Sequence, residues 1–181
     1  MTITQTKFGG LGGQGVIMSG MILGKAASIF EDKSATMTQA FGPEARGSAV
    51  SCQVIVSDDL VLYPYLVKAD ILTVLSQEAY NKYIADFEED GILIIEEDLV
   101  VPTSEHKTVY AVPATRYAEE LGKKMVVNIV MMGFFTAVTG LISKEAALEA
   151  VKATVPPKTV PLNTDAFNKG YDHGMKLKGG A

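Results

Sequence analysis

The sequence predicts an α/β fold in which a mostly parallel sheet lies between two layers of helices. Two observations lead to this prediction. Short apolar segments alternate with segments of helical periodicity along the 181 residues, as is typical of parallel sheets covered by helices. No repeat, low-complexity tract or long linker divides the chain, and its length suits one domain, residues 1–181. We therefore expect a single three-layer α/β/α domain.

The strands are predicted from short runs of apolar and β-branched residues. Ile71–Leu75 is apolar and lies between Asp70 and Ser76, as a buried parallel strand would. Leu60–Leu66 contains Pro64, which cannot donate to a central ladder, so this segment is either a short edge strand or a loop. The predicted strands are Thr2–Phe8, Ser34–Ala40, Ala49–Val56, Ile71–Leu75, Ile92–Ile95 and Thr108–Val112.

Helices are predicted where apolar residues recur at intervals of three and four. The helix over residues 128–139 is apolar nearly all round and should be buried, with Asn128 as its N-cap, whereas Ser143 caps the next helix. In the first helix, Gly20 and Gly24 share a face that a neighbour can approach closely. The predicted helices are Val16–Phe30, Gln77–Phe87, Thr115–Leu121, Asn128–Thr139, Lys144–Ala153 and Thr164–Lys178, with Val155–Asn163 as an irregular connector.

The charge and the cysteine and histidine content exclude several classes of function. The 16 Lys and Arg residues against 21 Asp and Glu give a net charge of −5 without a dense basic run, which argues against nucleic-acid binding. Cys52 is the only cysteine, so the chain forms no internal disulfide and holds no iron–sulfur cluster by itself. Its strand position favours a small buried apolar residue over a nucleophile. His106 and His173 lack metal-site spacing, and we predict no metal site and no catalytic residue.

No secretory or membrane-spanning segment is predicted. The first ten residues lack the charged and apolar regions of a signal peptide. The longest apolar run, Met125–Val138, is interrupted by Asn128, Gly133 and Thr136 and is too short to span a bilayer. We expect a cytoplasmic protein without a membrane partner.

The segment FGGLGGQGV at Phe8–Val16 is the first candidate site. Gly10, Gly12 and Gly15 match the pattern G-x-G-x-x-G, and Glu31 follows 21 residues after Gly10, as in dinucleotide-binding fingerprints. Such loops hold phosphates on free N–H groups at a helix N-terminus. A tight strand-to-helix connection without a ligand is the alternative, and Gln14 either adds its amide to the loop or faces solvent. The candidate ligand-binding residues of this loop are Gly10, Gly12, Gly13, Gln14 and Gly15.

The turn GPEARG is the second candidate site. Arg46 is suited to bind a carboxylate or a phosphate through two hydrogen bonds, and Glu44 is suited to position it or to accept a bond from a partner. An exposed, salt-bridged turn is the alternative. We assign Arg46 to a cofactor, and the residues predicted to face a partner or the active site are Gly42, Pro43, Glu44 and Gly47.

The segments GGQGV and TQAFGPEARG, in this order, resemble the gamma subunit of 2-oxoacid:ferredoxin oxidoreductases. The resemblance continues through ADILTVLSQEAYNKY, VPATRYAEELG, VVNIVMMG and LNTDAFNKGYDHG, and so covers almost the whole chain. One departure is Ser48, where the family pattern suggests a second glycine. The wording GPEARG favours the 2-oxoglutarate branch over the pyruvate branch, and branched-chain oxoacids and indolepyruvate stay open.

The resemblance implies oxidation of a 2-oxoacid with coenzyme A (CoA) to an acyl-CoA, CO2 and reduced ferredoxin, on a three-layer α/β/α fold. It also implies thiamine diphosphate with Mg²⁺ and iron–sulfur clusters. These centres must lie on partner subunits, because this chain has one cysteine and no G-D-G…N-N segment. We therefore expect a subunit that is inactive alone and reaches ferredoxin through the assembled complex.

CoA carries a pyrophosphate and a 3′-phosphate, and it is the candidate ligand of the loop Gly10–Gly15. Arg46 then faces the assembled active-site cleft, and Asn128 is a further candidate contact. Packing of the loop against a neighbouring subunit is the alternative. A stand-alone Rossmann-like nucleotide-binding protein, such as an NAD(P)-dependent enzyme, and a purely structural subunit are the competing functions. Tyr63 and Tyr65 are candidates for an aromatic anchor at a subunit interface or for core packing.

Overall fold

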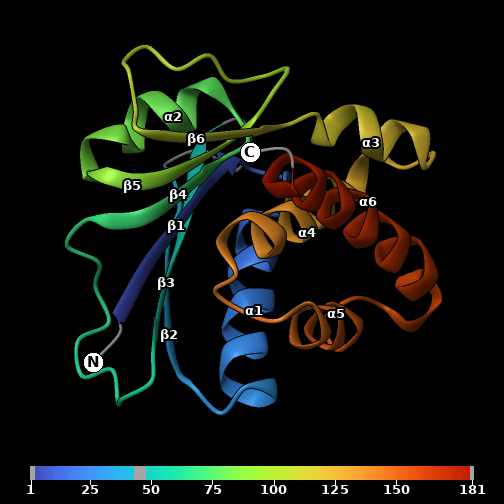
Figure 1. The fold of residues 1–181 in the computed structure, drawn as a ribbon, viewed down its shortest axis with the longest axis horizontal. Coiled ribbons are helices and arrows are strands. Elements are labelled where there is room, and N and C mark those ends of the chain that lie inside the picture. The colour runs from blue at the N-terminus through green and yellow to red at the C-terminus, as the bar shows by residue number, and fades with distance from the viewer. Residues whose placement is uncertain (1–2, 43–47, 180–181) are drawn as a thin grey trace.

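A six-stranded sheet forms the centre of the computed structural model, which describes residues 3–42 and 48–179 (Figure 1). Its strands are β1 (Ile3–Leu11), β2 (Ser34–Ala40), β3 (Ala49–Ser57), β4 (Ala69–Val74), β5 (Phe87–Glu96) and β6 (Thr108–Val112). They lie in the order β2-β3-β1-β4-β5-β6. β1, β4, β5 and β6 pair in parallel, whereas β3 runs antiparallel to both β1 and β2. The predicted mostly parallel sheet is confirmed.

The helices cover the two faces of this sheet unequally (Figure 1). Their bounds are α1 (Val16–Lys25, continued by a π-helical turn at Ala26–Phe30), α2 (Gln77–Tyr83), α3 (Ala114–Glu120), α4 (Val127–Thr139), α5 (Lys144–Lys152) and α6 (Val160–Gly179). α2 packs on one face alone. On the other face α1 and α4 contact the strands, and α3, α5 and α6 pack around them. The predicted three-layer α/β/α architecture is therefore confirmed.

β1 extends past Phe8, where the predicted strand ended, and includes the first two glycines of the glycine-rich segment. Gly9 and Gly10 both pair with β3, so they belong to the strand and not to the loop. A Cβ at Gly9 would lie 2.8 Å from the ring of Tyr83 in α2. Glycine at this position therefore lets α2 lie close to the central strand.

The predicted helix Gln77–Phe87 is wrong in its last turn. α2 ends at Tyr83, and after a short 3₁₀ turn β5 begins at Phe87, earlier than predicted. The Phe87 side chain is buried, and its backbone pairs with Ala69 of β4. Gly91, which lies between the predicted helix and the predicted strand Ile92–Ile95, is inside β5. Burial of the Phe87 ring against the sheet therefore overrides the helical pattern of the preceding residues.

Two predicted helix caps have different outcomes. Ser143 caps α5 as predicted, and its hydroxyl oxygen accepts a hydrogen bond from the Ala146 N–H at 3.2 Å. Asn128 is not the N-cap of α4. Val126 occupies that position, and Asn128 lies buried in the first turn of the helix. Its side-chain amide bonds instead to the carbonyl oxygen of Gly15, before α1.

α6 is longer than predicted. It begins at Val160 instead of Thr164, and Pro157–Thr159 just before it forms a 3₁₀ turn. Most of the predicted irregular connector is therefore helical. Pro161 falls in the first turn of α6, where a missing N–H breaks no intrahelical hydrogen bond.

α4 and α6 pack backbone against backbone. A Cβ at Gly133 of α4 would overlap the carbonyl group of Phe167 in α6, and a Cβ at Gly170 of α6 would overlap that of Val130 in α4. The two glycines thus bring the helices closer than larger residues would allow. α4 is buried over most of its length, as predicted. Among the described residues, neither α4 nor any other helix has the length and apolar character to cross a membrane.

The α2 face of the sheet has helical cover over only part of its area (Figure 1). α2 packs on a buried cluster that includes Leu72, Tyr80 and Leu93. The amino-terminal half of β1 is instead bordered by residues 58–68, which form neither helix nor strand. The loop alternative for Leu60–Leu66 is therefore the one that the structure adopts.

Gly133→Ala should destabilise the fold, whereas Gly24→Ala should not. A methyl group at residue 133 forces α4 and α6 apart and should lower the free energy of unfolding by about 1–3 kcal/mol. Gly24 lies in α1 with no atom within 4 Å of an added Cβ, so alanine there should raise stability by about 0.5–1 kcal/mol through helix propensity. Urea unfolding followed by circular dichroism measures both changes. Equal effects at the two positions would contradict the close packing.

Candidate functional site

The glycine loop lies at the carboxyl end of β1, where the sheet topology changes direction. After β1 the chain passes through α1 to β2 and β3 on one side of β1, and it then crosses to β4 on the other side. α1 and α2 cover opposite faces of the sheet (Figure 1). The loop Gly12–Gly15 leads directly into α1. Open α/β sheets commonly bind ligands at such a point.

The side-chain amide of Gln14 ties this loop to two strands. Its Oε1 atom accepts a hydrogen bond from the Leu11 N–H at 2.6 Å, and its Nε2 donates to the carbonyl oxygen of Leu75 at 3.0 Å. Leu75 follows the end of β4, so Gln14 bridges the ends of two neighbouring strands. A Cβ at Gly10 would lie 2.8 Å from the Gln14 Oε1 atom. Glycine at residue 10 therefore leaves space for this amide.

Asn128 in α4 fixes the last residue of the loop through a hydrogen bond. Its Nδ2 donates to the carbonyl oxygen of Gly15 at 3.3 Å, although the two residues are far apart in the sequence. Gly15 has a φ of 74°, in the left-handed region, and a Cβ there would lie 2.5 Å from the Asn128 carboxamide. Both the backbone conformation and the close contact therefore require glycine. The buried Asn128 side chain fixes the backbone at the start of α1.

The first turn of α1 presents backbone donors that no described residue accepts a hydrogen bond from. Gly15 is the N-cap, and no side-chain oxygen caps the helix. The N–H groups of Val16 and Ile17 consequently have no acceptor within the helix. Gly13 has a φ of 98°, and no atom of the described residues lies within 4 Å of an added Cβ, so they leave the outer side of the loop open. Unpaired N–H groups and the helix dipole together favour an anion at this position.

A groove of about 620 Å³ opens over these donors, a size typical of small-molecule sites. Its walls are mainly apolar, and the described residues that line it include no lysine or arginine. The groove thus offers backbone donors for an anionic group and apolar walls for the rest of a ligand. The lining residues are Leu11, Gly12, Gly13, Gly15, Val16, Ile17, Met18, Phe41, Gly42 and Val50.

The second candidate turn adjoins the same groove at both of its described ends. Gly42 lines the groove, and the carbonyl oxygen of Ser48 accepts a hydrogen bond from the Gly12 N–H at 3.3 Å. A Cβ at Gly42 would lie 2.5 Å from the Ser48 side chain, so the two ends lie close together. The structure therefore brings Gly42 and Ser48, the described residues on either side of this turn, next to the glycine loop. The remaining residues of the turn, Pro43, Glu44, Arg46 and Gly47, lie outside the described residues.

Glu31 does not complete a dinucleotide-binding site. It precedes β2, at the amino end of the sheet, whereas the glycine loop lies at the carboxyl end of β1. Its carboxylate accepts hydrogen bonds from Lys33 Nζ at 2.7 Å and from the Ser143 N–H at 2.5 Å. Burial raises the pKa of the Glu31 carboxyl, but these bonds outweigh it and the pKa is lowered. Glu31 thus forms an ion pair with a structural role. A dinucleotide at the glycine loop would not reach it, so the NAD(P) alternative lacks the acidic residue that should bind the ribose.

The apolar residues that line the groove could not be recognised as binding residues from the sequence. Met18, Phe41 and Val50 line it, but nothing distinguishes them in the sequence from core residues of a helix or strand. A second cavity of about 280 Å³ shares Met18 with the groove and is bordered by Asn128. The two hollows therefore flank the first turns of α1. Besides the glycine loop, the sequence marks this region with Asn128, a polar residue in the mainly apolar helix α4.

The family model for pyruvate ferredoxin/flavodoxin oxidoreductase matches residues 5–173, almost the whole chain. This chain belongs to that family. 2-Oxoglutarate synthase subunit KorC of Methanocaldococcus jannaschii is 42% identical to it over 96% of this chain and 95% of the relative. Pyruvate synthase subunit PorC of Methanothermobacter marburgensis is 32% identical over 97% and 99%. Ketoisovalerate oxidoreductase subunit VorA of the same organism is 30% identical over 95% of this chain, but over only 37% of its own length.

A solved structure agrees with these relatives. The keto/oxoacid ferredoxin oxidoreductase gamma subunit from Geobacter sulfurreducens PCA is 39% identical and superposes with a TM-score of 0.84 over 96% of this chain and 99% of that chain. The predicted resemblance to a gamma subunit of 2-oxoacid:ferredoxin oxidoreductases is therefore confirmed.

The one cysteine of this oxidoreductase-family chain is buried, and its thiol is poorly ionised. Cys52 is fully buried in β3, where its sulfur contacts the face of α1 that Gly20 leaves open. Burial raises the pKa of the Cys52 thiol to about 12, so the thiolate is scarce at neutral pH. The prediction of a small buried apolar residue is confirmed. Within residues 3–42 and 48–179, no three His, Cys, Asp or Glu side chains form a group that could hold a metal ion.

Ellman's reagent at pH 8 should not react with Cys52 in the folded chain. With a pKa of about 12, the folded thiol is ionised about 2,000-fold less at pH 8 than an unfolded thiol with a pKa of about 8.5. The raised pKa opposes ionisation, so reactivity should appear only on unfolding. Absorbance at 412 nm before and after adding urea measures the effect. Rapid reaction of the folded chain would show that the thiol is accessible.

Proposed function

We propose that this chain is the gamma-type subunit, formed by residues 1–181 as one domain, of a cytoplasmic 2-oxoglutarate:ferredoxin oxidoreductase. The identity to the 2-oxoglutarate relative is 42%, against 32% for the pyruvate relative and 30% for the ketoisovalerate relative, and this difference supports the substrate. The complete enzyme would convert 2-oxoglutarate, CoA and oxidised ferredoxin to succinyl-CoA, CO2 and reduced ferredoxin.

The redox and decarboxylation chemistry belongs to partner subunits in this proposal. An iron–sulfur cluster needs several thiolates, and this chain has a single cysteine that is buried in β3. Thiamine diphosphate with Mg²⁺ would supply the carbanion chemistry when bound to another subunit. The role left to this chain is to bind and position, and the groove over the glycine loop is the place for it.

CoA is the proposed ligand of this groove. The free N–H groups at the start of α1 and the open side of Gly13 suit one phosphate group of CoA. A phosphate in this position gains about 0.3–1 kcal/mol from the helix dipole, in addition to its hydrogen bonds. The apolar walls formed by Val16, Met18 and Phe41 suit less polar parts of the same molecule.

The remaining candidate residues have supporting roles in this proposal. Gln14 and Asn128 have their side-chain amides bonded to the protein, so they hold the loop in shape around the phosphate. Gly10 and Gly15 leave space for those two amides, and Gly12 joins the loop to the strand after the second turn.

The second turn supplies the positive charge that the described groove lacks. We assign to Arg46 a two-point hydrogen bond with a phosphate of CoA or with a carboxylate in the assembled active-site cleft. Glu44 positions it, and the turn residues Gly42, Pro43 and Gly47 shape the side of the turn that faces the cleft. The position of Gly42 and Ser48 beside the glycine loop supports this assignment.

Activity of the reconstituted complex tests the proposed function. The chain is co-expressed with its partner subunits, and reduction of ferredoxin is followed with each 2-oxoacid in the presence of CoA. We expect no activity from this chain alone, and in the complex a kcat/KM for 2-oxoglutarate at least about 10-fold above that for pyruvate, a branched-chain oxoacid or indolepyruvate. A complex that prefers another oxoacid would overturn the assignment of substrate, and an active isolated chain would overturn the subunit role.

Gly13→Asp in the same complex tests the CoA site, with Gly13→Asn as the matched control. Both variants introduce the same backbone strain and nearly the same volume at an open position, but only aspartate places a negative charge beside the phosphate. We expect Gly13→Asp to raise the KM for CoA at least about 10-fold more than Gly13→Asn does, with little change in the KM for 2-oxoglutarate. Equal KM values for CoA would contradict the site. Loss of assembly in Gly13→Asp alone would favour packing of the loop against a subunit.

A further inference from the structure

An exposed apolar patch lies at the other end of β1 from the glycine loop. Its members come from the segment that follows β3 and from the start of β1, and their exposed fractions range from 51% for Ile3 to 85% for Leu62. Together they expose on the order of 600 Å² of large side chains, at the upper end of single patches on monomeric proteins. The patch consists of Ile3, Leu60, Leu62, Tyr63, Tyr65 and Val67.

The sheet holds the backbone of this segment in place. The Val61 N–H donates to Ser34 Oγ at 3.1 Å, and the Val67 N–H donates to Gln5 Oε1 at 3.0 Å. A longer bond of 3.5 Å joins the Leu66 N–H to Gln53 Oε1. Polar side chains of β2, β1 and β3 thus bind the backbone, while the large apolar side chains stay exposed.

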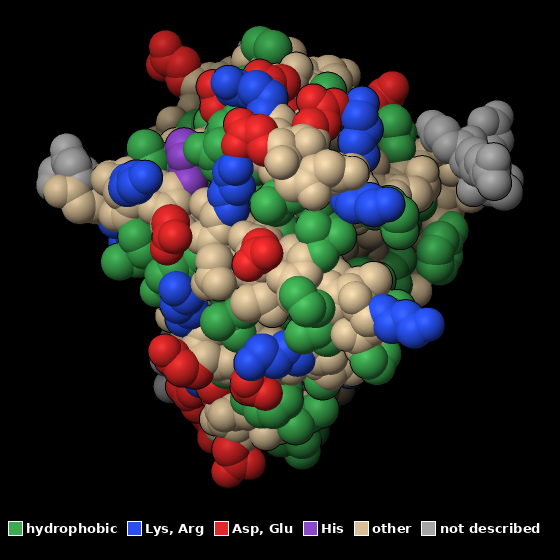
Figure 2. Space-filling view, turned by 90° about the vertical axis from the view of Figure 1, so that its right-hand side faces the viewer, with side chains coloured by type: hydrophobic (Ala, Val, Ile, Leu, Met, Phe, Trp, Pro, Cys, Tyr) green, Lys and Arg blue, Asp and Glu red, His purple; other side chains and the backbone are tan. Residues whose placement is uncertain are grey.

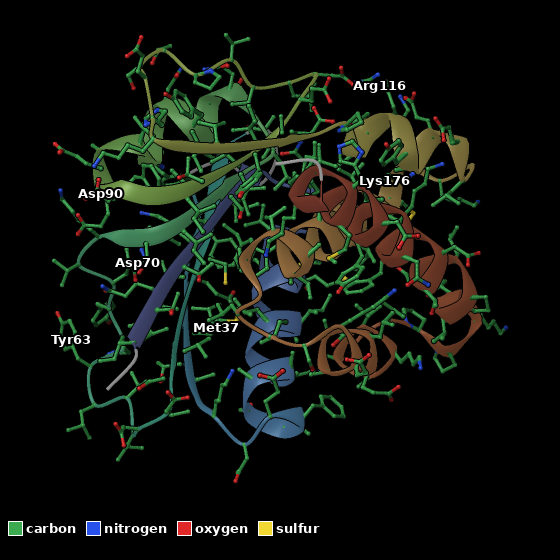
Figure 3. The ribbon with its side chains drawn as sticks, in the orientation of Figure 1. Met37, Tyr63, Asp70, Asp90, Arg116 and Lys176 are labelled. Carbon is green, nitrogen blue, oxygen red and sulfur yellow. The ribbon has the colours of Figure 1, made fainter. Side chains whose placement is uncertain are left out.

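The exposed side chains form a surface with a pair of packed tyrosine rings and an adjoining groove. The rings of Tyr63 and Tyr65 contact each other edge to face, with centroids 5.6 Å apart. Figure 3 shows Tyr63 directed away from the sheet. A groove of about 360 Å³ between the segment and the sheet is lined by Ile3, Ile55 and Leu62, among others. Such a groove accepts an apolar side chain, as the centre of a protein interface does.

The patch lies on a side of the molecule that the helices leave open. Figure 2 shows the helical side, where acidic and basic side chains are interspersed among the apolar ones. By contrast, residues 58–70 carry three aspartates and one lysine, and Lys68 lies 3.9 Å from the carboxylate of Glu88. Asp58 and Asp59 are exposed at the start of the segment. Because Lys68 is paired in this way while Asp58 and Asp59 are exposed, the edge of the patch is mainly acidic.

This charge favours one kind of occupant. A second copy of the chain, packed patch to patch, would bring its own carboxylates against these, and like charges disfavour that pairing. A different protein with an apolar centre and a basic edge fits both features. The length of the VorA relative points the same way, because its matched region is 37% of a longer polypeptide and so has further protein attached to it.

We propose that the patch is the docking surface for a different subunit of the same oxidoreductase, one whose facing surface is apolar at its centre and basic at its edge. The inference rests on the proposed function, since it requires a hetero-oligomer. The two ends of β1 then have different roles. The carboxyl end binds a ligand, and the amino end holds the chain in the complex.

Leu62→Asp tests the docking surface in the complex with the co-expressed partner subunits, with Val101→Asp as the matched control. Both side chains are strongly exposed, at 85% and 72%, and both substitutions add one negative charge. Val101 lies in a different loop, where its backbone is bonded to Gln77. We expect Leu62→Asp to weaken partner binding at least about 10-fold and Val101→Asp to change it less than about 2-fold. Interferometry measures the affinities, and urea unfolding confirms that both variants fold.

Hydrogen exchange on the wild-type chain, free and in the complex, gives a second readout. Slower exchange over residues 58–68 in the complex supports docking. Unchanged exchange there, together with unchanged affinity of Leu62→Asp, overturns the docking surface while an active complex leaves the proposed function intact. If the free chain dimerises through the patch, the occupant is a second copy and the proposal of a different subunit is overturned. A wild-type chain that binds no partner subunit overturns the proposed function and this inference with it.

Discussion

The fixed position of the loop after β1 is the constraint on which the candidate site depends. Gln14 bonds to the ends of β1 and β4, and Asn128 reaches from α4 to the carbonyl oxygen of Gly15. The preceding strand β1 and two elements distant in the sequence, β4 and α4, therefore hold the first turn of α1 in one place. Donors held in this way need little reordering when an anion arrives, so less conformational entropy is lost on binding. The same contacts explain why Gly10 and Gly15 cannot carry side chains.

The unequal cover of the sheet separates the internal packing of the chain from its external contacts. α1 and α4, with α5 and α6 outside them, bury one face of the sheet and form most of the core. The close contact of Gly133 with the α6 backbone makes this helical layer dense. The other face has α2 alone, and residues 58–68 border the open part. The larger core cluster therefore lies on one face of the sheet, and the other face combines a smaller cluster with exposed apolar side chains.

Much of the fold could be predicted because local pattern and tertiary environment agree. β2 and β6 have the predicted bounds, and Ser143 caps α5, since each depends on neighbouring residues. The predictions failed where a distant contact decides the outcome. Phe87 belongs to β5 because β4 pairs with it.

The same limit applies to the candidate site. The glycines could be read as a loop, but the partners of Gln14 and Asn128 could not, because both bonds cross long stretches of sequence. Glu31 matched a spacing rule and yet lies at the opposite end of the sheet, since the rule assumes the strand order of another fold.

The antiparallel insertion of β3 between β1 and β2 has a consequence for how this family can diversify. Because β2 runs in the same direction as β1, its last residue, Ala40, lies at the same end of the sheet as the glycine loop. The direction of β2 fixes where the connection to β3 begins, and it sets no requirement on the residue types of that connection. Substitutions between Phe41 and Ala49 can therefore change the residue types next to the glycine loop while β2 and β3 keep their register.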